Sequence, residues 1–214
     1  IPARPGLQQA LLALRYPNYR RFWMGALLSN TGSWLQAVTI PFVVYDLTAS
    51  AAWVGVAGFL QFAPAVALGP VGGSVADRFH RRSVLVATQS LAALVALALW
   101  AVWVAGVRSV AVVLALVAVG GSVAGVTIPS WQAFVSELVP RDVLLNAVTL
   151  NSAQFNAARA FGPALGGLVL GALGVGWAFL LNAWSFLAVL AALAAVRVPR
   201  RPRPAGPAPS LRDE

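Results

Sequence analysis

The sequence predicts an all-α integral membrane protein, and its composition is the first observation that does so. Of the 214 residues, 59 % are hydrophobic and 10 % are charged, and there is no cysteine. A soluble domain has about 45–50 % apolar and about 25 % charged residues, so this chain has too little polar surface to cover a globule in water. The composition therefore excludes a soluble enzyme, a disordered chain and a disulfide-stabilised scaffold.

Long stretches without charge are the second observation. A helix needs about 20 apolar residues to cross a hydrocarbon core of about 30 Å. Four stretches of sufficient length carry no charged side chain, at residues 22–45, 47–76, 83–107 and 109–136. Each predicts one membrane-spanning helix, and in chain order we expect these helices at 22–45, 52–76, 83–105 and 109–133.

The remaining apolar region is long enough for two more helices. Residues 143–196 are interrupted by a single charged side chain, that of Arg159. A cluster of glycines within residues 171–176 marks a turn near the middle of this region. We therefore expect the fifth and sixth spans at 144–171 and 175–196, which places the six-helix transmembrane bundle at residues 22–196.

The distribution of positive charge orients the six spans. All fifteen basic residues are arginines. With the N-terminus in the cytoplasm, thirteen of them lie on the cytoplasmic side, Arg108 lies outside and Arg159 lies within a span. The positive-inside rule thus predicts a multi-pass protein of the inner (plasma) membrane with both ends cytoplasmic. Because the arginines follow the topology and form no binding stripe, the net charge of +9 does not indicate a nucleic-acid partner.

Two polar segments flank the predicted bundle. Residues 1–21 form a cytoplasmic N-terminal segment ahead of the first span. Residues 197–214 contain five prolines and five arginines, a composition that cannot form a core and is typical of a linker. We expect this Pro/Arg-rich cytoplasmic linker to lead to a second half of the protein.

The loop between the second and third spans holds the most specific motif, the run GGSVADRFHRR at residues 72–82. Its glycines allow neighbouring helices to approach closely. Its acid can face the positive N-terminus of another helix, and its arginines can hold helix C-termini, carboxylates or lipid headgroups. The alternative is that the charges only fix the topology. The motif's candidate functional residues are Gly73, Asp77, Arg78, Arg81 and Arg82.

This run resembles the loop motif of the major facilitator superfamily, Gly-x-Leu-Ala-Asp-Arg-x-Gly-Arg-Arg, with Val75 in place of Leu and His80 in place of Gly. The resemblance implies that the six spans are the N-terminal half of a twelve-helix transporter. It also implies that Asp77 and the arginines latch the two halves together at the cytoplasmic face and control switching.

Two further stretches extend the resemblance. Residues 28–36, followed by YDLTAS at 45–50, look like the first helix of the enterobactin-exporter-like and macrolide-efflux-like branch. The run GPALGG at 162–167 is similar to a motif associated with drug–proton antiporters. The residues that carry this packing motif of the fifth helix are Gly162, Pro163, Gly166 and Gly167.

The fifth span also carries a polar stripe. At 100° per residue, Thr149, Ser152, Asn156 and Arg159 fall within an arc of about 80°. An arginine deep in a span costs at least about 2.5–3.5 kcal/mol, so we expect Arg159 to face protein or a water-filled cavity and to have a partner. It either binds an anionic substrate group or a carboxylate of the second half, or it bonds to carbonyls that Pro163 leaves free.

Polar residues in several apolar spans predict a hydrated cavity lined by the first, fourth and fifth helices. The residues we expect to contact substrate are Asn30, Gln36, Asn156 and Arg159. At the cytoplasmic end of the fourth helix, Glu137 and Arg141 are candidate inner-gate residues, and Glu137 could pair with Arg78 or Arg81. A solvated helix end is the alternative interpretation of Glu137.

The residues needed for catalysis or metal binding do not occur together. Ser122 lies in a glycine-rich stretch, but the one histidine, His80, lies in a loop, so no base is available within the bilayer. There is no cysteine and no cluster of histidines or acids that would indicate a metal. Nothing in the sequence resembles an ATP site. We therefore expect a transporter without a cofactor, and not an enzyme.

The predicted function is the export of small amphipathic or anionic molecules, of the drug or siderophore class, by alternating access and proton antiport. Uptake by the same fold and a non-transporting half-length fragment are the alternatives. No carboxylate lies deep in a span, so the sequence leaves the titrating acid open among Asp46, Asp77, Glu137 and the second half. The expected partners are a small-molecule substrate, protons, membrane lipid and the missing C-terminal six-helix half.

Overall fold

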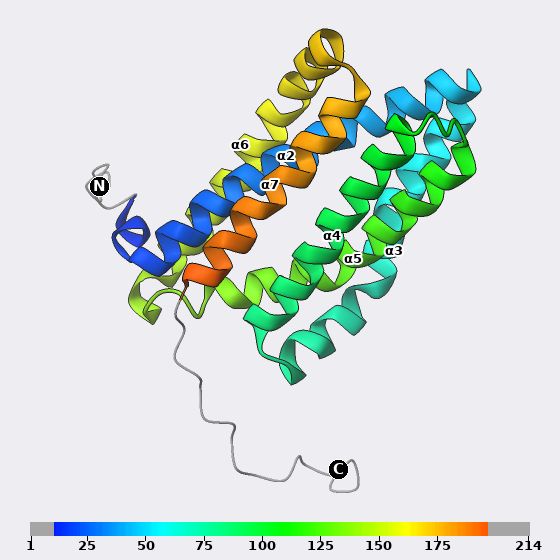
Figure 1. The fold of residues 1–214 in the computed structure, drawn as a ribbon. Coiled ribbons are helices and arrows are strands. Elements are labelled where there is room, and N and C mark those ends of the chain that lie inside the picture. The colour runs from blue at the N-terminus through cyan, green and yellow to red at the C-terminus, as the bar shows by residue number, and fades with distance from the viewer. Residues whose placement is uncertain (1–10, 197–214) are drawn as a thin grey trace, which may run out of the picture.

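The computed structural model describes residues 11–196, and its regular elements are all helical (Figure 1). The predicted linker at 197–214 and residues 1–10 of the predicted N-terminal segment lie outside the described residues. The elements are the short 3₁₀ helices η1 (Leu12–Arg15) and η2 (Arg141–Val143) and the long helices α2 (Pro17–Thr48), α3 (Ala51–Arg78), α4 (Arg81–Val104), α5 (Val110–Val135), α6 (Leu144–Leu173) and α7 (Val175–Ala195). The prediction of an all-α protein with six long helices is confirmed.

The helices begin and end differently from the spans predicted from charge. Helix α2 begins at Pro17, which occupies its first turn, and therefore includes Arg20 and Arg21. It ends where Ala49 adopts a left-handed conformation with φ of 48°. A charge limits how far a helix can enter the hydrocarbon core but does not end the helix, because a long side chain can extend its charged group towards water.

The helices differ in how strongly apolar they are. Four of them, α3, α4, α5 and α7, are long and apolar enough to cross a membrane. Helices α2 and α6 have sufficient length, at 32 and 30 residues, but they contain most of the amide and hydroxyl groups that interrupt the apolar sequence. Polar groups within a long helix are tolerated where they face protein or a cavity rather than lipid.

The long helices form two groups of three (Figure 1). Helix α2 packs against α6 and α7, whereas α5 packs against α3 and α4, and α4 and α7 join the two groups. Exchanging α2, α3 and α4 with α5, α6 and α7 turns the α2–α6 and α2–α7 contacts into the α5–α3 and α5–α4 contacts and leaves the α4–α7 contact unchanged. Such an exchange is the mark of an internal structural repeat.

Glycines set the closest helix contacts in both groups. A Cβ atom added to Gly121 of α5 would lie 2.6 Å from the carbonyl oxygen of Leu60 in α3. A Cβ atom on Gly25 of α2 would lie 2.8 Å from the Cβ atom of Ala192 in α7. Small residues therefore bring these backbones together, as is common where lipid provides no hydrophobic force between helices.

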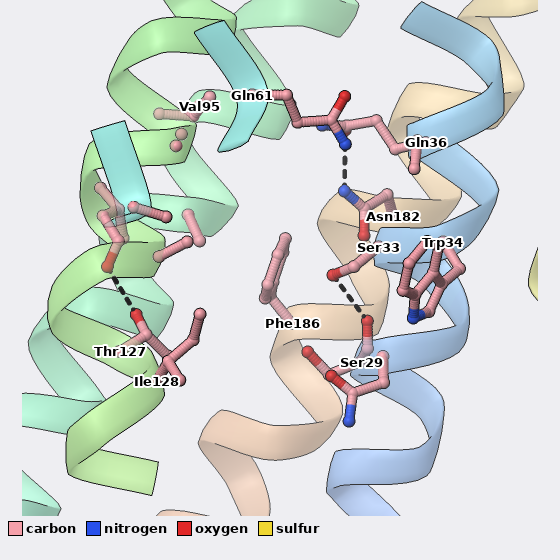
Figure 2. Close-up of a pocket in the computed structure, with 18 of the residues that line it drawn as sticks. Ser29, Ser33, Trp34, Gln36, Gln61, Val95, Thr127, Ile128, Asn182 and Phe186 are labelled. Carbon is pink, nitrogen blue, oxygen red and sulfur yellow. Dashed lines mark hydrogen bonds between the residues drawn. The ribbon is translucent and has the colours of Figure 1, made fainter. Parts of the chain in front are cut away.

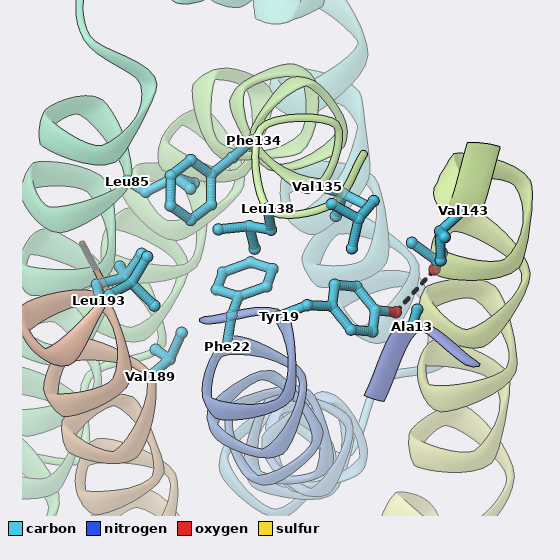
Figure 3. Packing of buried hydrophobic residues seen from close by; sticks show 13 residues of the cluster. Ala13, Tyr19, Phe22, Leu85, Phe134, Val135, Leu138, Val143, Val189 and Leu193 are labelled. Atoms are coloured by element: carbon cyan, nitrogen blue, oxygen red, sulfur yellow. Dashed lines mark hydrogen bonds between the residues drawn. The ribbon is translucent and has the colours of Figure 1, made fainter. Parts of the chain in front are cut away.

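Two large clusters of buried apolar side chains, and a small third one between α4 and α7, hold the helices together. One lies towards the end of the bundle that carries η1, the α3–α4 turn and residues 136–143, which we call the arginine-rich end. Figure 3 shows Phe22 packed among its side chains. The rings of Phe22 and Phe134 meet edge to face, with centroids 5.2 Å apart. A second cluster, around Val44, Leu99 and Phe179, joins the ends of α2 and α4 to the starts of α3, α5 and α7. The buried amide side chains, those of Gln89, Gln154 and Asn182, belong to none of these clusters.

Candidate substrate cavity and charged loop

A cavity of about 650 Å³ is lined by residues of all six long helices (Figure 2). This volume lies within the usual range of about 300–1,000 Å³ for small-molecule sites. Its walls combine aliphatic and aromatic side chains with neutral polar ones. The polar lining residues are Ser29, Asn30, Ser33, Gln36, Gln61, Gln89, Thr127, Gln132, Asn151, Ser152, Asn156 and Asn182.

Three of the four residues expected to contact substrate line this cavity, namely Asn30, Gln36 and Asn156. The Asn30 amide donates to Gln154 Oε1 at 3.0 Å. Gln36 Oε1 accepts a hydrogen bond of 2.7 Å from Asn182 Nδ2. These amides hold one another across the α2–α6 and α2–α7 contacts, which positions their remaining polar atoms.

Arg159, the fourth candidate, lies outside the cavity lining and is exposed. Its guanidinium carbon is 5.5 Å from the ring centroid of Trp34, which does line the cavity. No ion pair of Arg159 forms within residues 11–196. Arg159 lies outside the expected cavity position because the preceding residue, Ala158, is buried in the bundle, which leaves the arginine at the edge of the α2–α6 contact.

The small residues of α6 form part of that contact. A Cβ atom on Gly162 would lie 2.5 Å from the Cβ atom of Trp34, and one on Gly166 would lie 3.0 Å from the carbonyl oxygen of Leu35. Gly167 has nothing within 4 Å, so it lies away from the contact. Pro163 is accommodated inside the helix.

The charged residues of the loop at 72–82 make different contacts at the arginine-rich end. Arg81 pairs with Glu137 at 3.0 Å, and its guanidinium also donates to the carbonyl oxygen of Ala133. The pair joins the start of α4 to the end of α5. Arg141 is exposed in η2 and forms no ion pair within the described residues.

Arg82 has a different contact, at the C-terminus of α7. It donates to the carbonyl oxygens of Leu193 at 2.7 Å and Ala194 at 3.1 Å. Arg21 reaches the carbonyl oxygen of Ala195 at 3.4 Å. Cations at a helix C-terminus satisfy its last carbonyls and complement its dipole. Arg82 therefore ties α4 to α7 within this bundle.

Asp77 and Arg78 remain exposed at the end of α3, and neither forms an ion pair within residues 11–196. The motif glycine also differs from its neighbour. Gly73 has no atom within 4 Å of an added Cβ, whereas a Cβ on Gly72 would lie 2.8 Å from the Cα atom of Val126. Gly72 thus makes the close helix contact inside the bundle, and Gly73 lies on an open surface.

Several lining residues were not identified from the sequence, among them Asn151, Gln132 and Trp131. Asn151 Oδ1 accepts a hydrogen bond of 3.2 Å from Trp131 Nε1, which links α6 to α5. The sequence signal that could have identified them is an amide side chain within an apolar helix. It was not decisive because Asn151 lies outside the polar stripe of the predicted fifth span.

The comparisons with known proteins agree with this architecture. The family profile described as "Transmembrane secretion effector" (MFS_3) matches residues 8–209. The chain belongs to this transporter family. It is therefore a multi-pass membrane protein of the major facilitator superfamily (MFS). The members of this family are transporters and not enzymes.

Two relatives of the MFS chain are themselves transporters by name. This chain is 28 % identical over 160 residues to the uncharacterized MFS-type transporter YfiS of Bacillus subtilis, a match that covers 74 % of this chain and 37 % of the relative. It is 25 % identical over 171 residues to the staphyloferrin A transporter of Staphylococcus aureus, covering 79 % of this chain and 43 % of the relative. The MFS chain therefore spans less than half the length of these relatives.

Proposed function

We propose that this chain is the N-terminal half of a secondary active transporter that exports small amphipathic or anionic molecules, of the drug or siderophore class, by proton antiport. The observation that carries the proposal is the cavity of about 650 Å³ between the six helices of a chain whose family is described as secretion effectors. Its apolar walls and neutral polar groups suit an amphipathic solute of drug size.

The transport cycle requires a second half. Alternating access moves two helix bundles against each other around a site that lies between them. Helix α3 supports this arrangement, because only 6 % of the residues in its most apolar stretch of 18 are buried in the present bundle. A second six-helix bundle, following the linker at 197–214, would cover part of this surface and close the cavity.

The charged loop is proposed to control the cycle from the cytoplasmic face of the inner membrane. Arg81 and Glu137 act as an inner gate within this half, where they form an ion pair of 3.0 Å. Exposed Asp77 and Arg78 are available to the second half, with Gly73 on the same open surface. Contact at this loop would hold the cytoplasmic side closed, and its release would open that side.

Transport by the full-length protein in oriented membrane vesicles tests the proposal. The probes are dansylglycine, which is anionic, and dansyl glycinamide, which is neutral and of the same size. We expect everted vesicles to accumulate at least one probe when the interior is acidified, and a protonophore to abolish the accumulation. Accumulation only in right-side-out vesicles would indicate uptake instead, and no accumulation above vesicles lacking the protein would contradict export of this substrate class.

A further inference from the structure

The cavity is lined without any ionisable side chain among the described residues. The described acids, Asp46, Asp77, Glu137 and Asp142, lie at helix ends or in a connecting segment and do not reach the lining. Arg159 lies outside the lining as well. A charged group buried here would lose its hydration and find no countercharge in this half, which is strongly unfavourable.

The neutral polar groups of the cavity still have unused hydrogen-bonding capacity. The side chains of Gln61 and Gln132 make no hydrogen bond within residues 11–196, so each side-chain amide offers both a donor and an acceptor. Gln36 accepts from Asn182 through its oxygen, which leaves its Nε2 group as a donor. Free donors and acceptors therefore occur together, as recognition of hydroxyl and amide groups requires.

The Asn30–Gln154 pair adds adaptability. Gln154 is 2 % exposed, and its Nε2 atom has no hydrogen-bond partner among the described residues. If both amides rotate by 180°, Gln154 donates to Asn30 instead of accepting from it. The pair then keeps one hydrogen bond, while the free atom of Asn30 changes from an acceptor to a donor.

One cation lies immediately outside the neutral lining. The Trp34 ring contacts Phe155 at a centroid distance of 5.9 Å, and both rings line the cavity. The Arg159 guanidinium lies beside Trp34, one helical turn beyond Asn156. The α2–α6 contact thus places an aromatic wall between the neutral interior and a positive charge, and we call the Asn156–Arg159 region the rim.

We infer that the cavity accepts the uncharged, hydrogen-bonding part of an amphipathic substrate, and that any anionic group of that substrate stays at the rim with Arg159. The inference rests on the proposed function and specifies its substrate class. It divides recognition between amides, which bind the neutral body, and a single guanidinium, which binds an acid at one end. A substrate with charge at both ends would not fit this arrangement.

Cysteine labelling of the full-length protein measures the charge of both regions without requiring transport. The 214-residue chain has no cysteine, so single cysteines are introduced at Ser33 in the cavity or at Asn156 at the rim, with any cysteine elsewhere in the protein replaced. Each variant is treated with anionic ethylsulfonate and cationic ethyltrimethylammonium methanethiosulfonate. Each rate is divided by the rate of the same reagent with 2-mercaptoethanol.

We expect the two normalised rates at Ser33→Cys to agree within about fivefold, because no net charge faces this position. At Asn156→Cys the anionic reagent should be favoured by about tenfold, and Arg159→Gln should abolish this preference. Adding Arg159→Gln to Ser33→Cys is the matched control and should leave both rates unchanged, which shows that the fold is retained.

A preference above about fivefold at Ser33→Cys would overturn the inference, because it would show that the second half supplies a charge to the cavity. A preference at Asn156→Cys that survives Arg159→Gln would overturn the role of the rim. Failure of both reagents to react at Ser33→Cys would show that there is no aqueous cavity. If the labelling rates are as expected but the vesicles do not transport the probes, the result would count against the proposed function and not against this inference.

Discussion

Gly162 and Gly167 lie five residues apart on α6 but face different surroundings. An added Cβ at Gly162 would lie 2.5 Å from the Cβ atom of Trp34, whereas one at Gly167 would meet nothing within 4 Å. Gly162→Ala should therefore destabilise the protein by about 1–3 kcal/mol through overpacking. Gly167→Ala should be neutral or slightly stabilising, since Ala is favoured over Gly in a helix by about 1 kcal/mol.

Thermal unfolding of the two full-length variants in detergent measures this difference. A lower midpoint for Gly162→Ala together with an unchanged or raised midpoint for Gly167→Ala is the expected result. Equal midpoints would show that α2 and α6 are not in close contact at Gly162.

Arg159 permits a second prediction at the scale of a residue. If it binds the anionic end of a substrate, Arg159→Gln should weaken transport of dansylglycine by about tenfold, the size of a lost hydrogen bond to a charged group. Transport of dansyl glycinamide should change little, and Arg159→Lys should retain part of the activity on the acid. The initial rates in everted vesicles give the comparison, and an equal loss for both probes would indicate a structural role for Arg159.

Helix α7 depends at its C-terminus on a side chain from α4. Arg82 donates to the carbonyl oxygens of Leu193 and Ala194, while its motif neighbour Arg78 is exposed and forms no ion pair within residues 11–196. Loss of a cation at a helix C-terminus costs about 0.3–1 kcal/mol. Arg82→Ala should therefore loosen the last turn of α7, and Arg78→Ala, the matched control, should not.

Hydrogen exchange of the full-length protein in detergent tests the role of Arg82. We expect amide exchange near residues 192–196 to become about two- to fivefold faster in Arg82→Ala, as the lost free energy implies. Similar acceleration in Arg78→Ala would show that the effect comes from the total charge of the loop and not from the contact with α7.

At the scale of the whole molecule, the exposed end of α3 is the feature that needs a second half. Asp77 is exposed and forms no ion pair within the described residues, although an acid at this place is suited to face the N-terminus of another helix. Asp77→Asn in the full-length protein should therefore abolish transport of the probe that the unmodified protein accumulates. Membrane insertion should be preserved, because the substitution removes no contact inside this bundle.

The control for Asp77→Asn is Asp142→Asn, which removes an exposed acid of η2 that forms no ion pair within the described residues and should retain transport. Vesicle transport and the amount of inserted protein are measured together for both variants. Unchanged transport in Asp77→Asn would argue against a latch between the halves.

The sequence predicted part of the candidate site for a clear physical reason. Amides such as Asn30 and Gln36 are unfavourable in lipid, so their presence in apolar helices indicates a protein-facing or hydrated position, and both line the cavity. The same argument predicted that Arg159 faces protein or a water-filled cavity and has a partner, whereas the structure places its side chain exposed, outside the lining and beside Trp34, because an arginine side chain is long enough to lie at the edge of a helix contact. Gln132 and Asn151 were missed, since their surroundings come from neighbouring helices.

The sequence by itself determined the membrane class and the six long helices, because hydropathy and charge act on each segment separately. Only the tertiary structure decided that Gly72 rather than Gly73 packs against α5, that Arg82 holds α7, and that Arg159 lies outside a cavity free of charge. These outcomes depend on how each helix is rotated and tilted against its neighbours. That orientation is fixed by contacts between segments far apart in the sequence, which the pattern within one helix does not record.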